Sequence, residues 1–270
     1  MQNISSLSTN RAFLYGDAVF ETLKILNSKI LFLEDHYFRL MSSMRILRME
    51  IPMNFTMEYF ENEILSEVKS KNIDLSARAR ITVYRKDGGY YLPNDNNVEF
   101  DISVSALEKS FYEIVNSDYE VDIYKDFYVS KQLISTLKST NKIINIVGSI
   151  YAKENGYDNC LLLNDNKNVV EALQGNIFMI KDGILSTPPI SDGCLNGIMR
   201  KQILNIAKKI DSIEVVENSI SPFDLQKADE LFITNVIKGI QPITKYRKKE
   251  YSNKIANLLL AKLNEQIKNI

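Results

Sequence analysis

The chain alternates between segments with two different spacings of apolar residues. Residues 18–26 place apolar side chains with the two-residue period of a strand and are rich in strand-forming residue types. A turn at Asn27 and Ser28 joins this segment to residues 29–33 as a predicted hairpin. From residue 34 the spacing becomes that of an amphipathic helix. Such interleaving of strands and helices predicts a mixed α/β (α+β) fold.

The same two spacings continue along the chain and divide it into two parts. We predict helices at residues 34–47 and 56–71 and around 143–151, 199–210 and 255–267, and strands at 78–85, 99–106, 119–124, 159–163, 176–181 and 230–234. The pattern weakens at residues 107–117, so we place a junction there between a domain of residues 1–112 and a domain of residues 113–270. A cleft between two such domains is a usual place for a cofactor.

Composition narrows the function. The 270 residues carry 33 basic and 34 acidic side chains, which gives no electrostatic reason to expect a nucleic-acid partner. His36 is the one histidine, which argues against a zinc site and a Ser-His-Asp triad, and Cys160 and Cys194 lie in unrelated contexts. Residues 1–10 lack the apolar core of a signal peptide, and no apolar run approaches the roughly 20 residues of a membrane span. These features predict a soluble cytoplasmic protein without a metal or a membrane partner.

Four local sequences point to a particular chemistry. They are Arg11-Ala-Phe-Leu-Tyr-Gly-Asp-Ala-Val-Phe-Glu-Thr22, His36-Tyr-Phe-Arg39-Leu40, Leu137-Lys138-Ser-Thr-Asn141-Lys142 and Val169-Val170-Glu171-Ala-Leu-Gln-Gly-Asn176-Ile-Phe178. Together they resemble the class IV aminotransferases, also called fold-type IV pyridoxal-5′-phosphate (PLP) enzymes. The resemblance implies PLP as cofactor, a small N-terminal α/β domain, a larger barrel-like C-terminal domain that binds PLP, and a homodimer acting on a small molecule.

The resemblance assigns three principal roles. Lys138 resembles the lysine that holds PLP covalently and then acts as the general base, for which it must be desolvated. Glu171 resembles the glutamate that keeps the pyridine nitrogen protonated, so that the ring accepts electrons. Arg39 resembles the arginine that holds the cofactor phosphate with its planar guanidinium. Each has a plainer alternative as a surface charge, and Lys131 and Lys142 are local rivals of Lys138.

Two further segments complete a predicted phosphate site. Asp192-Gly-Cys-Leu-Asn-Gly-Ile-Met-Arg200 precedes a helix, so Gly197 and the backbone N–H groups of Ile198 and Met199 are expected to meet the phosphate. Thr234 and Asn235 end a strand and offer a hydroxyl and an amide, and Asn176 is placed beside them as a further cofactor-binding residue. Outside this set, Arg85 is a candidate for binding a substrate carboxylate or, equally, a surface arginine. His36 is interpreted as structural.

Three details favour one reaction within the family. Lys138 and Asn141 are spaced Lys-x-x-Asn, which is similar to the lyases and the D-amino acid aminotransferases. The segment Asn196-Gly-Ile-Met-Arg200 and the segment Thr234-Asn235-Val236 both look like the lyase versions of their loops. They favour a 4-amino-4-deoxychorismate lyase of folate biosynthesis, which releases pyruvate and 4-aminobenzoate. A branched-chain or D-amino acid aminotransferase is the main alternative.

A non-catalytic member of the family is a further alternative. Only 15 residues precede Gly16, and the family usually has an additional strand there. A weaker sheet in the small domain, or a start placed too late, would explain the difference.

Overall fold

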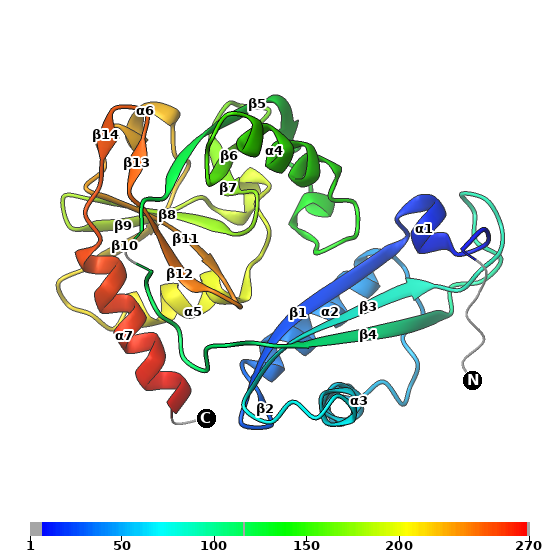
Figure 1. Cartoon of the computed structure of the whole chain (residues 1–270). Helices are drawn as coiled ribbons and strands as arrows, with labels where there is room; N and C mark the ends of the chain where they lie inside the picture. The colour runs from blue at the N-terminus through cyan, green and yellow to red at the C-terminus, as the bar shows by residue number, and fades with distance from the viewer. Residues whose placement is uncertain (1–6, 116, 269–270) are drawn as a thin grey trace. The chain divides into compact units, whose positions relative to one another are not determined.

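A computed structural model describes residues 7–115 and 117–268 (Figure 1). The chain forms two compact units. The first contains the residues up to Ser110 together with Lys138–Asn141, and the second contains Phe111–Leu137 and the residues from Lys142 onward. The sequence analysis placed the domain boundary between residues 112 and 113, whereas the contacts first divide the chain between Ser110 and Phe111. The sequence did not predict that Lys138–Asn141 leaves the second unit and folds with the first.

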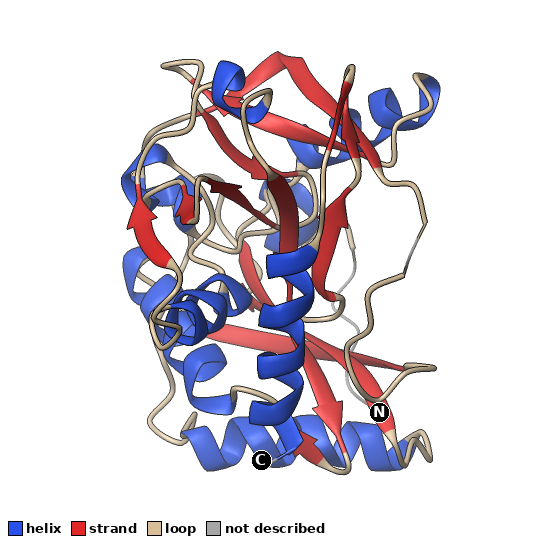
Figure 2. Cartoon of the chain, turned by 90° about the vertical axis from the view of Figure 1, so that its left-hand side faces the viewer, coloured by secondary structure: helices blue, strands red, loops and turns tan. Residues whose placement is uncertain are grey.

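The first unit is a four-stranded antiparallel sheet, and two of its helices pack on one face of that sheet. Figure 2 colours the strands of the chain red and its helices blue. Its elements are α1 (Arg11–Tyr15), β1 (Ala18–Leu26), β2 (Lys29–Ile30), α2 (Leu33–Ile46), α3 (Met57–Ser70), β3 (Ser76–Arg85) and β4 (Val98–Ala106), and the strand order is β2-β1-β3-β4. Asn27 and Ser28 have φ angles of 49° and 60°, as a tight hairpin turn requires, so the predicted hairpin is confirmed.

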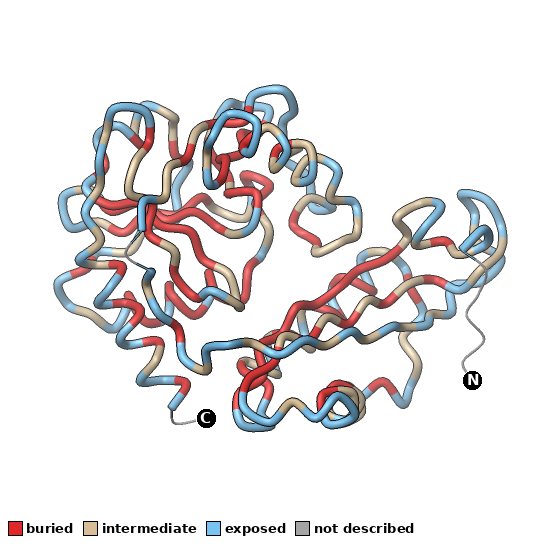
Figure 3. Tube along the Cα trace, in the orientation of Figure 1, coloured by how far each residue is buried: buried red, intermediate tan, exposed pale blue. Residues whose placement is uncertain are grey.

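The core of this unit lies between the sheet and the helices α2 and α3. In β3, Ala77, Ala79, Ile81 and Val83 enter this core, while the residues between them are half-buried. In contrast, β1 is buried along its whole length, on both faces (Figure 3). A residue of β1 therefore has protein around it whichever face it occupies.

The second unit contains two five-stranded sheets. Their elements are β5 (Glu120–Val129), η1 (Leu133–Thr136), α4 (Ile143–Glu154), β6 (Asn159–Asn164), β7 (Val169–Ala172), β8 (Asn176–Lys181), β9 (Ile184–Thr187), η2 (Ile190–Asp192), α5 (Ile198–Ala207), β10 (Glu214–Glu217), α6 (Pro222–Leu225), β11 (Glu230–Asn235), β12 (Gly239–Ile243), β13 (Lys245–Tyr246), β14 (Lys249–Glu250) and α7 (Lys254–Lys268). The strand orders are β10-β9-β8-β11-β12 and β14-β13-β5-β6-β7.

Apolar side chains of both sheets form the central core of the second unit, with Ile123 and Leu161 from one sheet and Ile177 and Ile233 from the other. Helix α4 packs on the far side of the β5–β6–β7 sheet through a second cluster that includes Tyr124 and Leu162. Helices α5 and α7 contact β11 of the other sheet. Among the described residues, no helix is both long and apolar enough to span a membrane.

Candidate active site

The segment of Lys138 adds a short antiparallel partner to the edge of β1. The N–H of Phe20 donates to the carbonyl of Lys138 at 2.8 Å, and the N–H of Thr140 donates to the carbonyl of Ala18 at 3.1 Å. The side chains of Thr140 and Asn141 both donate to the carbonyl of Gly16, at 3.1 and 3.2 Å. Residues from two of the four motifs are thereby joined within the first unit.

The side chain of Lys138 is half-buried and lies against an aromatic ring. Its Nζ is 4.6 Å from the centroid of the Phe20 ring, and the guanidinium carbon of Arg80 is 3.8 Å from the same centroid. The rival Lys131 is exposed and forms an ion pair with Asp192 at 3.3 Å in the second unit. Lys142 is the N-cap residue of α4. Of the three lysines, Lys138 has the environment closest to that of a catalytic amine.

Arg39 belongs to a buried cluster of three ionisable side chains. Its Nε donates to Oε1 of Glu21 at 2.7 Å, and its Nη2 donates to Oε2 at 2.6 Å. Nδ1 of His36 lies 2.7 Å from the same Oε2. Glu21 comes from β1, while His36 and Arg39 are one turn apart on α2 and so share a face of that helix.

Electrostatics fix the protonation states in this cluster. Burial opposes ionisation of Glu21, but Arg39 and His36 outweigh it and lower the pKa of Glu21 to about 2. Burial also lowers the pKa of His36, since the opposing effect of Glu21 is weaker. His36 is therefore neutral near pH 7. Because an ionised carboxylate can only accept hydrogen bonds, Nδ1 of His36 carries the proton and donates a hydrogen bond to Oε2 of Glu21.

Four of the predicted residues meet within the second unit, and Leu195 connects two of them. Oε2 of Glu171, on β7, accepts the N–H of Leu195 at 2.9 Å. Nδ2 of Asn176, the first residue of β8, donates to the carbonyl of Leu195 at 2.8 Å. Asn176 also pairs with Thr234 across β8 and β11. A Cβ atom on Gly197 would collide with the Asn176 side chain, so this close approach requires glycine.

The same region has the features of a phosphate site. Helix α5 begins at Ile198, and its N-cap residue Gly197 makes no side-chain capping bond. The first N–H groups of a helix attract anions through their hydrogen bonds and the helix dipole. In the part of the chain that the structure describes, Oγ1 of Thr234 is buried and has no hydrogen-bond partner. Two kinds of donor therefore fit the phosphate of PLP.

Asn235 uses its side chain locally. Its Oδ1 accepts the N–H groups of Ile237 and Lys238 at 3.1 and 2.9 Å, and its Nδ2 donates to the carbonyl of Gln174 at 3.2 Å. These bonds fix the turn between β11 and β12. Its predicted role in cofactor binding stays a prediction, and the side chain acts first as a turn-former.

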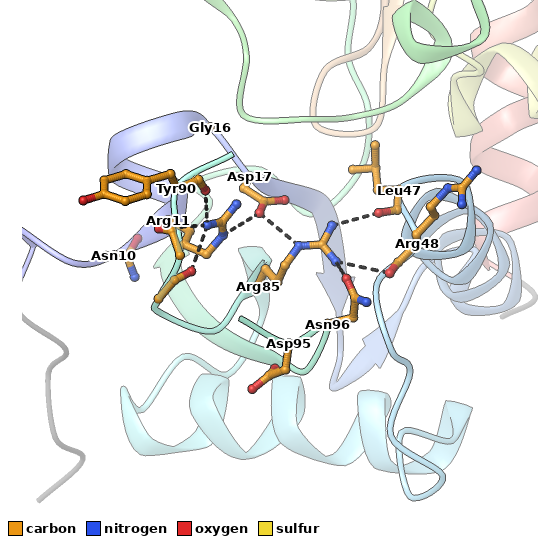
Figure 4. Close-up of polar contacts among 12 residues, drawn as sticks. Asn10, Arg11, Gly16, Asp17, Leu47, Arg48, Arg85, Tyr90, Asp95 and Asn96 are labelled. Atoms are coloured by element: carbon orange, nitrogen blue, oxygen red, sulfur yellow. Dashed lines mark hydrogen bonds and ion pairs between the residues drawn. The ribbon is translucent and has the colours of Figure 1, made fainter. Parts of the chain in front are cut away.

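Arg85 occupies an internal network that the sequence did not predict (Figure 4). It is 6% exposed, and its guanidinium donates to Asp17, to Asn96 and to the backbone carbonyls of Leu47 and Arg48. These contacts do not suit a surface arginine, and they favour a structural role over binding of a substrate carboxylate.

Arg11 is the second arginine of this network. Nε of Arg11 donates to Oδ2 of Asp17 at 2.9 Å, and this is the oxygen that also accepts from Arg85. Nη1 of Arg11 donates to backbone carbonyls of the Gly88–Tyr90 loop (Figure 4). One carboxylate therefore holds two buried arginines.

Glu21 is a member of the Arg39 cluster that the sequence analysis did not single out. A pattern pointed to it, because Glu21 shares the period-two positions of the core residues Val19 and Leu23. An acidic residue at a core-facing position requires a buried cationic partner. The pair His36 and Arg39, one helical turn apart, was available to supply that partner.

Comparison with known proteins identifies the family. Residues 18–246 match the family described as amino-transferase class IV, and the chain belongs to this family. A candidate branched-chain-amino-acid aminotransferase of Methanocaldococcus jannaschii is 30% identical, over 97% of this chain and 89% of the relative. A D-alanine aminotransferase of Listeria innocua is 28% identical, over 87% of this chain and 80% of the relative.

The fold is shared with solved structures. The crystal structure of a candidate 4-amino-4-deoxychorismate lyase from Legionella pneumophila has a TM-score of 0.86 at 24% identity and covers 98% of this chain, with 96% of its own chain matched. This similarity confirms the predicted fold-type IV class. Members of the family are enzymes that use PLP, so the protein is a PLP enzyme and the non-catalytic alternative is not supported.

The buried cluster predicts acid sensitivity. The folded pKa values of His36 and Glu21 lie below their ordinary values of 6.5 and 4.5, so the unfolded chain binds more protons as the pH falls below each. The contribution of His36 to the free energy of unfolding is fully present above pH 6.5, and that of Glu21 is fully present above pH 4.5. Each contribution is lost as the pH falls through the folded pKa of its group. Glu21→Gln should cost about 3–5 kcal/mol at pH 7 because it leaves Arg39 buried without its counter-charge. The difference from wild type should shrink as the pH approaches 2, which urea unfolding measures. A difference that stays constant with pH contradicts this account.

Arg85→Gln should destabilise the protein by about 2–4 kcal/mol, because it removes a charged partner of Asp17 and leaves buried carbonyls without donors. Lys86→Gln, at the next and exposed position, is the matched control and should have little effect. Denaturant unfolding and KM are measured on both variants. A raised KM with unchanged stability would instead support the carboxylate-binding role.

Proposed function

We propose that the protein is a PLP-dependent 4-amino-4-deoxychorismate lyase that releases pyruvate and 4-aminobenzoate. The observation that carries this proposal is the turn after β11. Val236 stands there without a hydroxyl, and the Asn235 side chain is engaged in the turn itself. Aminotransferases commonly have another hydroxyl residue at the position of Val236, and the valine at this position offers no such donor.

The proposed roles are those that the family resemblance implies. Lys138 holds the cofactor and then removes a proton from the ring carbon beside the substrate amino group. Glu171 keeps the pyridine nitrogen protonated, with its orientation fixed by the N–H of Leu195. Arg39, Thr234 and the N-terminus of α5 bind the phosphate. When bound, PLP withdraws electrons from the reacting carbon of the substrate. Loss of pyruvate makes the substrate ring aromatic, so the protein mainly supplies orientation and a path for the proton.

An aminotransferase is the second candidate, because the relatives named above at 28–30% identity are named as aminotransferases. Such an enzyme acts on branched-chain or D-amino acids and passes the amino group to a 2-oxo acid. The two reactions differ in their products. A lyase forms equal amounts of pyruvate and 4-aminobenzoate without any amino acceptor.

Product analysis tests this proposal. PLP-loaded protein is incubated with enzymatically generated aminodeoxychorismate, and in parallel with amino acids and 2-oxoglutarate. We expect equal release of pyruvate and 4-aminobenzoate, which Lys138→Ala abolishes and the matched Lys142→Ala retains. Amino transfer without 4-aminobenzoate would replace the lyase by the aminotransferase. Activity of Lys138→Ala equal to wild type would overturn the assignment of the lysine.

We further propose that the protein works as a cytoplasmic homodimer, as the resemblance implies. The outer face of α4 supports a self-association surface. Ile143, Ile146 and Ile150 are 66, 54 and 52% exposed, and Leu133 and Ile134 of η1 are exposed as well. Since the opposite face of α4 packs in the core, this helix is apolar on two sides, which favours burial of the outer side by a partner. A stripe on one helix can pair with its own copy across a two-fold axis.

The double variant Ile146→Lys, Ile150→Lys should therefore sediment as a monomer at concentrations where the wild type is a dimer. Met53→Lys introduces a lysine at an exposed apolar position of the first unit and is the control, expected to stay dimeric. A dimer unaffected by the double variant would place the interface elsewhere.

A further inference from the structure

The Glu21–Arg39–His36 cluster is not explained by stability alone. Removing three polar groups from water costs several kcal/mol per ion, and a well-packed apolar set of similar volume is often as stable as a buried ion pair. Glu21 is 1% exposed and His36 is fully buried. We therefore look for a role of these polar side chains that apolar residues at the same positions could not perform.

The geometry indicates that this role concerns the direction of the Arg39 guanidinium. Glu21 accepts from Nε and Nη2, which lie on one edge of the guanidinium plane. Two parallel hydrogen bonds of this kind fix both the plane and its rotation. A guanidinium has five N–H donors in one rigid plane, so fixing two of them also fixes the directions of the other three. The Glu21 pair thus determines where those three donors point.

His36 constrains the other partner of the pair. It donates from Nδ1 to Oε2 of Glu21, the oxygen that also accepts from Nη2 of Arg39. A carboxylate held from two directions cannot rotate about its last bond without losing one of them. As His36 and Arg39 lie on the same face of α2, the helix sets the distance between the two donors.

We propose that Glu21 is a positioning residue that fixes the guanidinium of Arg39 for the cofactor phosphate, with His36 holding the carboxylate in place. This inference rests on the proposed role of Arg39 in phosphate binding. Glu21 acts through Arg39 and does not itself touch the cofactor. The orientation is set within the first unit, before any ligand binds.

A simpler role for Glu21 predicts the opposite effect on binding. If Glu21 only neutralised the charge of Arg39, then Glu21→Gln would strengthen the attraction of Arg39 for a phosphate. If Glu21 positions Arg39, the same substitution weakens phosphate binding although it adds net positive charge. The sign of the change therefore separates the two roles.

The test compares PLP with pyridoxal, which lacks the phosphate. Apo protein of each variant is titrated with both compounds, and binding is followed by absorbance. We expect Glu21→Gln and Arg39→Gln each to weaken PLP binding by about 10- to 100-fold, the loss typical of removing an orienting outer partner at metal sites. Pyridoxal affinity should change little. The double variant should be no weaker than Arg39→Gln alone, because both substitutions remove one interaction.

Three further variants complete the test. His36→Asn keeps a donor near the position of Nδ1 and should retain more PLP affinity than His36→Leu. Glu21→Asp keeps the charge but shortens the side chain, so it should lie between wild type and Glu21→Gln. It also serves if Glu21→Gln does not fold. Glu67→Gln is the matched control, because it breaks an exposed ion pair with Lys71 on α3 and should leave both affinities unchanged.

The outcomes distinguish this inference from the proposal beneath it. Equal losses of PLP and pyridoxal affinity in Glu21→Gln would show a merely structural role, and tighter PLP binding would show charge neutralisation. Either result overturns the inference while leaving Arg39 in place. If Arg39→Gln does not change the ratio of the two affinities, the phosphate role of Arg39 itself is wrong.

Discussion

The first unit depends on β1, a strand that is buried on both faces. The Lys138 segment also pairs with the edge of β1 near Ala18 and Phe20. One side chain, Glu21, enters the core beneath the sheet and binds Arg39 and His36. The preceding side chain, Phe20, lies on the opposite face against Lys138. The backbone of the same strand holds the Lys138 segment through two hydrogen bonds. A displacement of β1 would therefore move the lysine and the arginine together.

Sequence periodicity predicted the elements whose spacing is regular and whose ends carry a recognisable residue. The hairpin turn at Asn27 and Ser28 adopts the expected left-handed conformation, β8 has the expected bounds, and Thr56 caps α3 by accepting the N–H of Tyr59. The short strands β10 and β12 and the helix α1 were not predicted, because four or five residues contain too few periods to be recognised. Periodicity also carries no information about partners. Nothing local to residues 138–141 indicates that they pair with β1 rather than with their neighbours in the chain.

How well the position of each predicted site residue could be foreseen depends on which groups it contacts. Glu171, Asn176, Thr234 and Gly197 come together because adjacent strands and one loop bring them there, and the motifs contained that loop. The burial of Arg85 could not be predicted, because two of its four partners are backbone carbonyls, which carry no signal in the sequence, and the other two are the distant side chains of Asp17 and Asn96. Glu21 could have been found from an acidic residue at a core-facing position. The choice between lyase and aminotransferase rests on a few side chains at the ends of strands, where the fold imposes little constraint.

The insertion of Lys138–Asn141 into the first unit has a consequence for how the protein can be divided. A fragment ending at Ser110 contains every strand of the four-stranded sheet, yet it lacks the residues that cover the edge of β1 near Ala18 and Phe20. That edge would present unpaired N–H and C=O groups beside apolar side chains, which is a template for pairing with other chains. The chain passes between the units at three points along its length, at residues 110–111, 137–138 and 141–142. The first unit is thus compact in space but is not encoded by one continuous stretch of sequence. A fusion protein that contained only residues up to Ser110 would lack Lys138.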